Sequence, residues 1–338
     1  MTGGGAAAAP VPLLAARNLK KHFPLRGGVL HRVQAVVQAV DDVSFEVRPG
    51  ETLGIVGESG CGKSTTARLL MRLVTPDAGQ VVFDGTSAGT PGGLGLHDLR
   101  RQMQMVFQDS YASLNPRLPA AMSIAYGPLV HGVARKSALE RAARLLDAVG
   151  LRPELFANRY PHELSGGQRQ RINIARALAL EPRLLILDEA VSALDRSIGA
   201  QVLNLLLDLK RRFNLTYVFI SHDLNVVQFV SDRVLVMYLG KVVEIGPVDA
   251  VYGAPQHPYT RALLSAMPSM DPDRRIEQAP LGGDPPNPIN PPSGCRFRTR
   301  CAFAEDVCAR REPPLAGASG HDAACHMLVS GSGHTRAA

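Results

Sequence analysis

The stretch Gly57-Glu58-Ser59-Gly60-Cys61-Gly62-Lys63-Ser64-Thr65 decides the fold of this chain of 338 residues. It fits the phosphate-binding loop pattern G-x-x-x-x-G-K-[S/T]. An apolar run at residues 52–56 precedes it, and residues 66–73 have helical apolar spacing. Strand, loop and helix therefore stand in the order that the motif requires. A chance glycine-rich turn before a helix is the alternative, and the flanking pattern argues against it.

The residue types in this loop suit a triphosphate. Gly57, Gly60 and Gly62 let backbone N–H groups curl around phosphate oxygens, and the following helix adds the positive end of its dipole. We expect Lys63 to neutralise the β- and γ-phosphates and the Ser64 hydroxyl to ligate Mg²⁺. The sequence therefore predicts a nucleoside triphosphate site.

Composition narrows the class of protein. The chain is 45% hydrophobic and 20% charged, which is ordinary for a globular protein, and its apolar runs are shorter than a membrane span of ~18 residues. Its net charge of +7 comes from scattered basic residues, and aromatic residues make up only 5% without any Trp. An aromatic platform for nucleic-acid bases is therefore not expected. Residues 1–14 are rich in Gly and Ala and predict a disordered lead-in rather than a signal peptide, so we expect a cytosolic protein.

Residues 15–255 alternate strand and helix patterns. Strands are expected at 40–47, 80–83, 103–107, 184–187 and 217–220, with a final hairpin at 234–238 and 241–245. Helices are expected at 137–149, at 165–178 and along the apolar stripe of 198–213. This alternation indicates an α/β nucleotide-binding core.

Two further motifs carry chemistry. Asp188 ends a buried apolar strand, where it can help to hold Mg²⁺, and Glu189 follows where it can orient and deprotonate a water molecule. Ser165-Gly166-Gly167 opens a helix and leaves free N–H donors for an anion, which fits the nucleotide of a different subunit. A simple Ser N-cap is the alternative for this second motif.

With these motifs in place, residues 15–255 resemble the ATPase subunit of an ATP-binding cassette (ABC) transporter. The resemblance implies an α/β P-loop NTPase (RecA-like) core with an antiparallel β subdomain and a helical ABC subdomain at about residues 109–160. Six motifs occur in the family's order: the P-loop Gly57–Thr65, the Q-loop Gln108, the signature Leu164–Gln168, the Walker B strand ending at Asp188 with Glu189, the D-loop ending at Asp195, and the switch His222.

The resemblance implies a role for each motif. ATP and Mg²⁺ would be held by Gly57–Thr65, Gln108 and Asp188, and Phe23 would stack on adenine. Ser165 and Gly167 of a facing subunit would close over the γ-phosphate.

The remaining family roles concern hydrolysis and its transmission. Glu189 would polarise the attacking water, and His222 would contact the γ-phosphate. Asp195 would act across the dimer interface, and Gln108 would sit at the hinge of the helical subdomain.

Residues 108–117, 238–244 and 257–264 look like the oligopeptide/dipeptide importer branch, and 188–195 is nearer the second of its paired ATPases. Ser110 stands where Pro is usual. Arg196 and Gly199 depart from the usual residues after the D-loop, and these two departures bear on partner fit. The implied partners are a second ABC ATPase in a heterodimer, two membrane permease subunits and an extracytoplasmic substrate-binding protein. The implied location is the cytoplasmic face of the inner membrane.

Two questions about function stay open at this stage. The cargo could be a dipeptide, an oligopeptide, a nickel chelate or glutathione. A soluble ABC ATPase that acts on nucleic acid or ribosomes, with a zinc-type C-terminal module, is the alternative class. Such relatives generally carry two cassettes, whereas this chain has one P-loop.

Residues 256–338 form a different segment, rich in Pro and Gly and expected to be a loop-rich extension. Four of the five cysteines lie here: Cys295, Cys301, Cys308 and Cys325. Their spacing is too wide for ordinary zinc knuckles, so a metal site and four reduced thiols both remain open. Resemblance to the importer branch implies a structural [4Fe–4S] cluster, with zinc as the alternative. His321 and His326 are possible zinc ligands that we expect to be solvated.

Overall fold

The computed structural model describes residues 11–27, 32–267, 287–318 and 320–337. Most of the predicted lead-in, residues 1–10, lies outside the described residues. Within the remainder of that segment, Leu13 and Leu14 are buried, and the first strand begins at Leu14. The folded chain therefore starts before the end of the predicted lead-in.

An eight-stranded sheet forms the centre of the molecule, in the order β11-β12-β10-β9-β3-β8-β7-β6. Strands β9, β3, β8, β7 and β6 run parallel to one another, whereas β10 pairs antiparallel with β9 and with β12, and β12 pairs antiparallel with β11. The strands are β3 (Thr52–Val56), β6 (Met103–Val106), β7 (Leu184–Asp188), β8 (Thr216–Ile220), β9 (Arg233–Tyr238), β10 (Lys241–Pro247), β11 (Ala316–Ala318) and β12 (His321–Ala323).

Continuous apolar runs explain the parallel strands. Every residue of β3, β7 and β8 is buried, as expected for strands that are covered on both faces. The predicted strands at 184–187 and 217–220 and the hairpin at 234–245 are confirmed. The helices around this sheet are α1 (Lys63–Leu70), α6 (Gly166–Leu178), α7 (Arg196–Phe213), α8 (Leu224–Val230), α9 (Val248–Gly253) and α10 (Pro258–Ser265).

A second sheet is antiparallel and four-stranded, in the order β2-β1-β4-β5. One hydrophobic core joins it to the central sheet, because Val43 and Phe83 belong to the same buried cluster as Leu53 and Ile55 of β3. The elements of this part are β1 (Leu14–Gly27), β2 (Arg32–Val47), β4 (Ala78–Phe83), β5 (Thr86–Ser87) and α2 (Leu96–Gln102).

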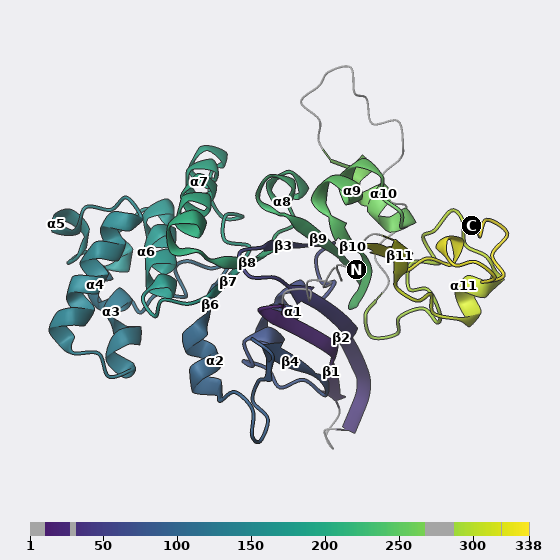
Figure 1. The fold of residues 1–338 in the computed structure, drawn as a ribbon, viewed down its shortest axis with the longest axis horizontal. Coiled ribbons are helices and arrows are strands. Elements are labelled where there is room, and N and C mark those ends of the chain that lie inside the picture. The colour runs from purple at the N-terminus through teal and green to yellow at the C-terminus, as the bar shows by residue number, and fades with distance from the viewer. Residues whose placement is uncertain (1–10, 28–31, 268–286, 319, 338) are drawn as a thin grey trace, which may run out of the picture.

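A lobe of helices lies at one end of the molecule, on the left in Figure 1. Its buried face includes Ile124 of α3 and Leu146 of α4, which share a core cluster with Ile172 of α6. The lobe contains α3 (Ala120–Val130), α4 (Arg135–Ala148), α5 (Pro153–Phe156) and the 3₁₀ turn η1 (Pro161–Glu163). These elements occupy the stretch for which the sequence predicts a helical subdomain.

The C-terminal extension lies at the opposite end and joins the central sheet (Figure 1). β12 pairs with β10 through Glu244 opposite Ala323, so the extension is more than loops. Its other elements are α11 (Asp306–Arg310) and the 3₁₀ turn η2 (His326–Leu328). Among the described residues, no helix has the length and apolar character needed to span a bilayer.

Candidate functional site

The predicted motifs gather at one edge of the central sheet. Gly57 follows β3, Gln108 follows β6, Asp188 ends β7, and His222 follows β8. These four strands are parallel neighbours in the order β3-β8-β7-β6. Their carboxyl ends therefore meet, and this edge is where ligands bind in open α/β sheets.

The phosphate-binding loop has a backbone that only glycine can form. Gly57 and Gly62 have φ values of 150° and 106°, and a Cβ on either would lie 2.2 Å from a carbonyl oxygen. The buried Lys63 opens α1, and its Nζ donates to the carbonyl oxygens of Gly57 at 2.7 Å and Glu58 at 3.0 Å. The loop thus holds its own cation at the start of a helix, next to N–H groups that can bind an anion.

A hydroxyl and a carboxyl group are in contact next to the phosphate-binding loop. The Ser64 Oγ donates a hydrogen bond to Asp188 Oδ1 at 3.0 Å. Asp188 is buried, and burial raises the pKa of its carboxyl above the usual range despite the Ser64 hydrogen bond. A hydroxyl and a carboxylate are the hard oxygen donors that Mg²⁺ accepts, so these residues fit the ion by their chemistry.

Glu189 is the centre of a second polar group. Gln108 Nε2 donates to Glu189 Oε2 at 2.8 Å, and His222 Nδ1 lies 3.4 Å from the same oxygen. Glu189 has a left-handed backbone, φ 50°, which is held by its N–H bond to the Ile220 carbonyl at 2.9 Å. A carboxylate fixed in this way, beside an amide and an imidazole, can accept a proton from water.

The residues expected to serve a facing subunit lie elsewhere on the chain. Ser165 caps α6 in a capping box, accepting from Gln168 N at 3.3 Å and donating its own N–H to Gln168 Oε1 at 2.9 Å. Gly167 lies in the first turn of that helix, and the exposed Asp195 precedes α7. Phe23 is on β1, 37% exposed, with the Lys21 ammonium 5.5 Å from its ring. Their predicted roles in ATP binding stay predictions.

The structure also adds contacts to the phosphate-binding loop that motif reasoning missed. The Glu58 N–H donates to the Tyr259 hydroxyl at 2.9 Å, and the Glu58 carboxylate pairs with Arg300 at 2.8 and 3.1 Å. Tyr259 lies in the stretch that resembles the importer branch, which is the one signal that the sequence offers. Arg300 resembles the other scattered basic residues of the extension.

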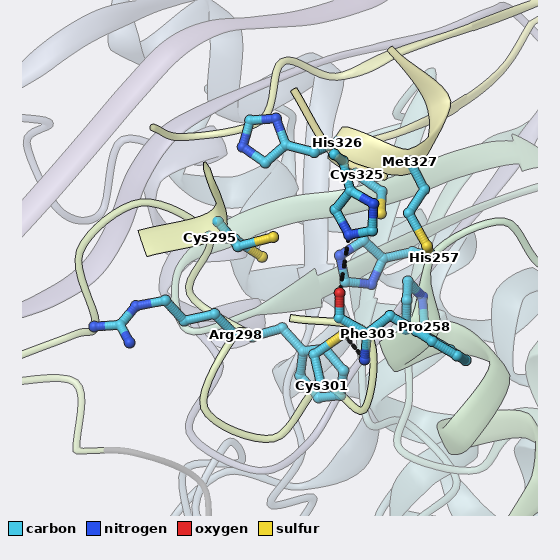
Figure 2. Close-up of a pocket in the computed structure, with 12 residues that line it drawn as sticks. His257, Pro258, Cys295, Arg298, Cys301, Phe303, Cys325, His326 and Met327 are labelled. Carbon is cyan, nitrogen blue, oxygen red and sulfur yellow. Dashed lines mark hydrogen bonds between the residues drawn. The ribbon is translucent and has the colours of Figure 1, made fainter. Parts of the chain in front are cut away.

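The four cysteines of the extension line one cavity, together with His257 and Met327 among others (Figure 2). Cys61 is buried in the phosphate-binding loop and is not among them. Burial raises the pKa of Cys295 to about 12, and the neighbouring Cys308, Cys325 and Cys301 add to this shift. Burial also raises the pKa of Cys301 and of Cys325, so an unliganded Cys295 thiol is neutral at neutral pH.

Within the described ranges, no three His, Cys, Asp or Glu side chains meet the geometry of a metal site. The donor set of four thiols fits a thiophilic metal or cluster by its chemistry, and such a ligand would deprotonate the thiols. The ligand spacing of a bound metal is nevertheless not present.

The expectation that His321 and His326 are solvated is wrong. Both side chains are buried, because each has a fixed polar partner. His321 Nε2 lies 2.7 Å from a carboxylate oxygen of the fully buried Glu244, and His326 Nε2 lies 2.9 Å from the Arg311 carbonyl oxygen.

The fold and the polar groups at the sheet edge define a P-loop nucleoside triphosphatase. Two family models match the chain: "ABC transporter" over residues 40–192, and "Oligopeptide/dipeptide transporter, C-terminal region" over residues 243–308. The chain belongs to the ABC transporter ATPases, in the oligopeptide/dipeptide transporter branch.

Relatives support this assignment over nearly the whole chain. A probable peptide ABC transporter ATP-binding protein of Sinorhizobium fredii is 52% identical, covering 93% of this chain and 90% of the relative. An oligopeptide transport ATP-binding protein of Bacillus subtilis is 50% identical, covering 93% and 97%.

A solved structure of a dimeric ATP-binding cassette in a post-hydrolysis state, bound to ADP and Pi, has a TM-score of 0.60 with this chain. The two are 29% identical, and the match covers 70% of this chain and 98% of the other. The predicted fold class is confirmed.

Proposed function

We propose that the chain is the ATP-hydrolysing motor subunit of a membrane importer for peptides, either dipeptides or oligopeptides. The observation that carries hydrolysis is the convergence of Gln108 and His222 on Glu189 beside the phosphate-binding loop. The peptide cargo is supported by the match at residues 243–308 and by relatives whose names describe peptide transport. These relatives favour the importer over a soluble ABC ATPase that acts on nucleic acid or ribosomes.

The proposal gives each residue of the site one role, carried over from the family resemblance. Lys63 exchanges its carbonyl partners for the β- and γ-phosphates of ATP, which Gly57–Thr65 surround. Ser64, Asp188 and Gln108 would hold Mg²⁺, which when bound would supply positive charge to the site. Phe23 stacks on adenine.

Hydrolysis is an in-line displacement at the γ-phosphorus. Glu189 accepts a proton from water as the water oxygen bonds to phosphorus and the bond to the leaving ADP oxygen breaks. His222 contacts the γ-phosphate and stabilises the charge that develops there.

A facing subunit completes the site. Ser165 and Gly167 of that subunit supply helix N-terminal donors to the γ-phosphate, and Asp195 acts at the interface. The dimeric state of the similar solved cassette supports this arrangement. The assembly is a heterodimer with a second ABC ATPase on two membrane permease subunits, at the cytoplasmic face of the inner membrane. An extracytoplasmic binding protein delivers the peptide.

ATP-dependent dimerisation tests this proposal. The Glu189→Gln variant, purified with its candidate partner ATPase, should form a stable dimer in light scattering with MgATP and dissociate with MgADP. Full turnover should require the partner ATPase and the permeases. A strictly monomeric chain with maximal, partner-independent turnover would contradict the proposal.

We also propose that Cys295, Cys301, Cys308 and Cys325 hold a structural [4Fe–4S] cluster. Support comes from the shared cavity and from the resemblance of this region to the importer branch. Anaerobically purified protein should be brown and contain iron and acid-labile sulfide. Cys301→Ser should lower that content and Cys61→Ser should not. A colourless protein that contains zinc would show the alternative metal and overturn the cluster.

A further inference from the structure

Glu58 places a negative charge in a loop that must receive a polyanion. Its main chain is already committed, because its carbonyl oxygen accepts from Lys63 and its N–H donates to the buried Tyr259. Its side chain is 23% exposed and reaches the C-terminal extension. A carboxylate here works against triphosphate binding unless its charge is balanced.

Arg300 balances that charge with a two-point contact. Its Nη1 lies 2.8 Å from Glu58 Oε2 and its Nη2 lies 3.1 Å from Oε1, and its side chain is only 6% exposed. The guanidinium also lies 6.0 Å from the centre of the Tyr238 ring. The fork geometry fixes the direction of the carboxylate as well as its charge.

The position of Arg300 is set by the turn that runs from Cys295 to Cys301. Cys295 N donates to the Cys308 carbonyl at 2.8 Å, and Arg300 N donates to the Phe297 carbonyl at 3.0 Å. The buried Phe297 ring lies 5.3 Å from the Tyr238 ring and 5.5 Å from the Tyr259 ring. The tyrosine that supports the loop and the arginine that neutralises it are therefore held by one aromatic cluster.

We propose that Arg300 is a positioning residue of the ATP site, which neutralises Glu58 and directs its carboxylate toward the extension. The proposal rests on the proposed ATP binding at Gly57–Thr65. It gives the C-terminal extension a share in nucleotide binding, although the motifs of the site all lie before it. The ion pair of Arg300 with Glu58 affects bound ATP and the transition state equally. Its loss should therefore change KM more than kcat.

A double-mutant cycle on the full chain tests this role. Titration with a fluorescent ATP analogue and MgATP competition would give the Kd for wild type, Arg300→Gln, Glu58→Gln and the double variant. Arg300→Gln should weaken MgATP binding about tenfold, the effect of one unpaired charge in a partly screened site. MgADP, which carries less charge, should be affected less.

Substitution of the acidic partner, Glu58, should change the MgATP affinity in the opposite direction. Glu58→Gln removes the negative charge from the phosphate-binding loop and should tighten MgATP binding by about threefold. The neutral double variant should return to within about twofold of wild type. Arg300→Lys keeps the charge without the fork and should recover most of the affinity.

Arg310→Gln is the matched control, because Arg310 lies in the same extension and pairs with Asp306 on the surface. It should leave the MgATP affinity unchanged. Arg300→Gln with wild-type affinity, or Glu58→Gln that weakens binding as much as Arg300→Gln does, would overturn the proposal. If Arg300→Gln does not fold, the direction in which Glu58→Gln changes the MgATP affinity tests the proposal by itself. A wild-type chain that binds no MgATP would overturn the ATP site itself.

Discussion

The sheet edge and the cysteine cavity are two candidate sites that are built in different ways. At the edge, side chains are already hydrogen-bonded to one another, as in Ser64 with Asp188 and Gln108 with Glu189. In the cavity, the four cysteines come from turns and short elements, and burial keeps the thiol of Cys295 neutral. Parallel strands thus preorganise the first site, whereas turns and burial bring the four thiols of the second together.

The largest expected effect is the loss of ATP turnover after a substitution at the sheet edge. Glu189→Gln removes the proposed proton acceptor but keeps the shape of the side chain, so turnover should fall by about 10²–10⁴ while MgATP binding persists. Steady-state hydrolysis and nucleotide titration measure the two quantities separately. Glu181→Gln, an exposed residue paired with Arg141, is the control and should keep wild-type turnover. Near-normal hydrolysis by Glu189→Gln would show that this residue of the sheet edge is not needed for hydrolysis.

The next effect concerns the aromatic cluster that joins the two sites. Phe297→Ala opens a cavity among buried rings and should lower the free energy of unfolding by about 3–5 kcal/mol. Urea denaturation followed by circular dichroism would measure it. Phe229→Ala, on a ring that is 62% exposed, should change stability by less than about 0.5 kcal/mol. Equal effects of the two variants would show that the extension does not pack as described.

The smallest expected effect comes from removing one tyrosine hydroxyl, and it distinguishes a loss of stability from a loss of nucleotide binding. Tyr259→Phe leaves the Glu58 N–H without its acceptor and should cost about 1 kcal/mol of unfolding free energy. Tyr252→Phe removes a comparable hydrogen bond to the Leu224 carbonyl, away from the phosphate-binding loop. Both variants should lose similar stability, but only Tyr259→Phe should weaken MgATP binding. Identical Kd values for the two would contradict the link between extension and loop.

Most of the sheet edge could be predicted from the sequence because its motifs are local. A buried apolar run and the polar residue that follows it occupy adjacent positions, so Asp188 and His222 are recognisable without knowledge of the fold. Helix α3 had no prediction, because Gly127 and Pro128 interrupt its pattern. The short strand β11 reads Ala-Gly-Ala, which has little intrinsic preference for a sheet.

The rest depends on contacts between distant parts of the chain. Arg300 and Glu58 are separated by 242 residues, and no periodic pattern connects them. Glu244 is fully buried and accepts hydrogen bonds from Gln256 N and His257 N, and its contact with His321 also joins residues that are 77 positions apart. Such pairs are selected by three-dimensional packing, which spacing along the sequence does not reveal.

The pairing of β12 with β10 has a practical consequence for shortened versions of the protein. A chain cut after residue 255, where the resemblance to the ATPase core ends, would leave the N–H and C=O groups of β10 open along its Glu244 side. It would also leave Glu244 without the imidazole of His321. An uncovered, largely apolar strand edge is a template for intermolecular pairing, so such a fragment should self-associate. The last strands of this chain therefore also protect its solubility.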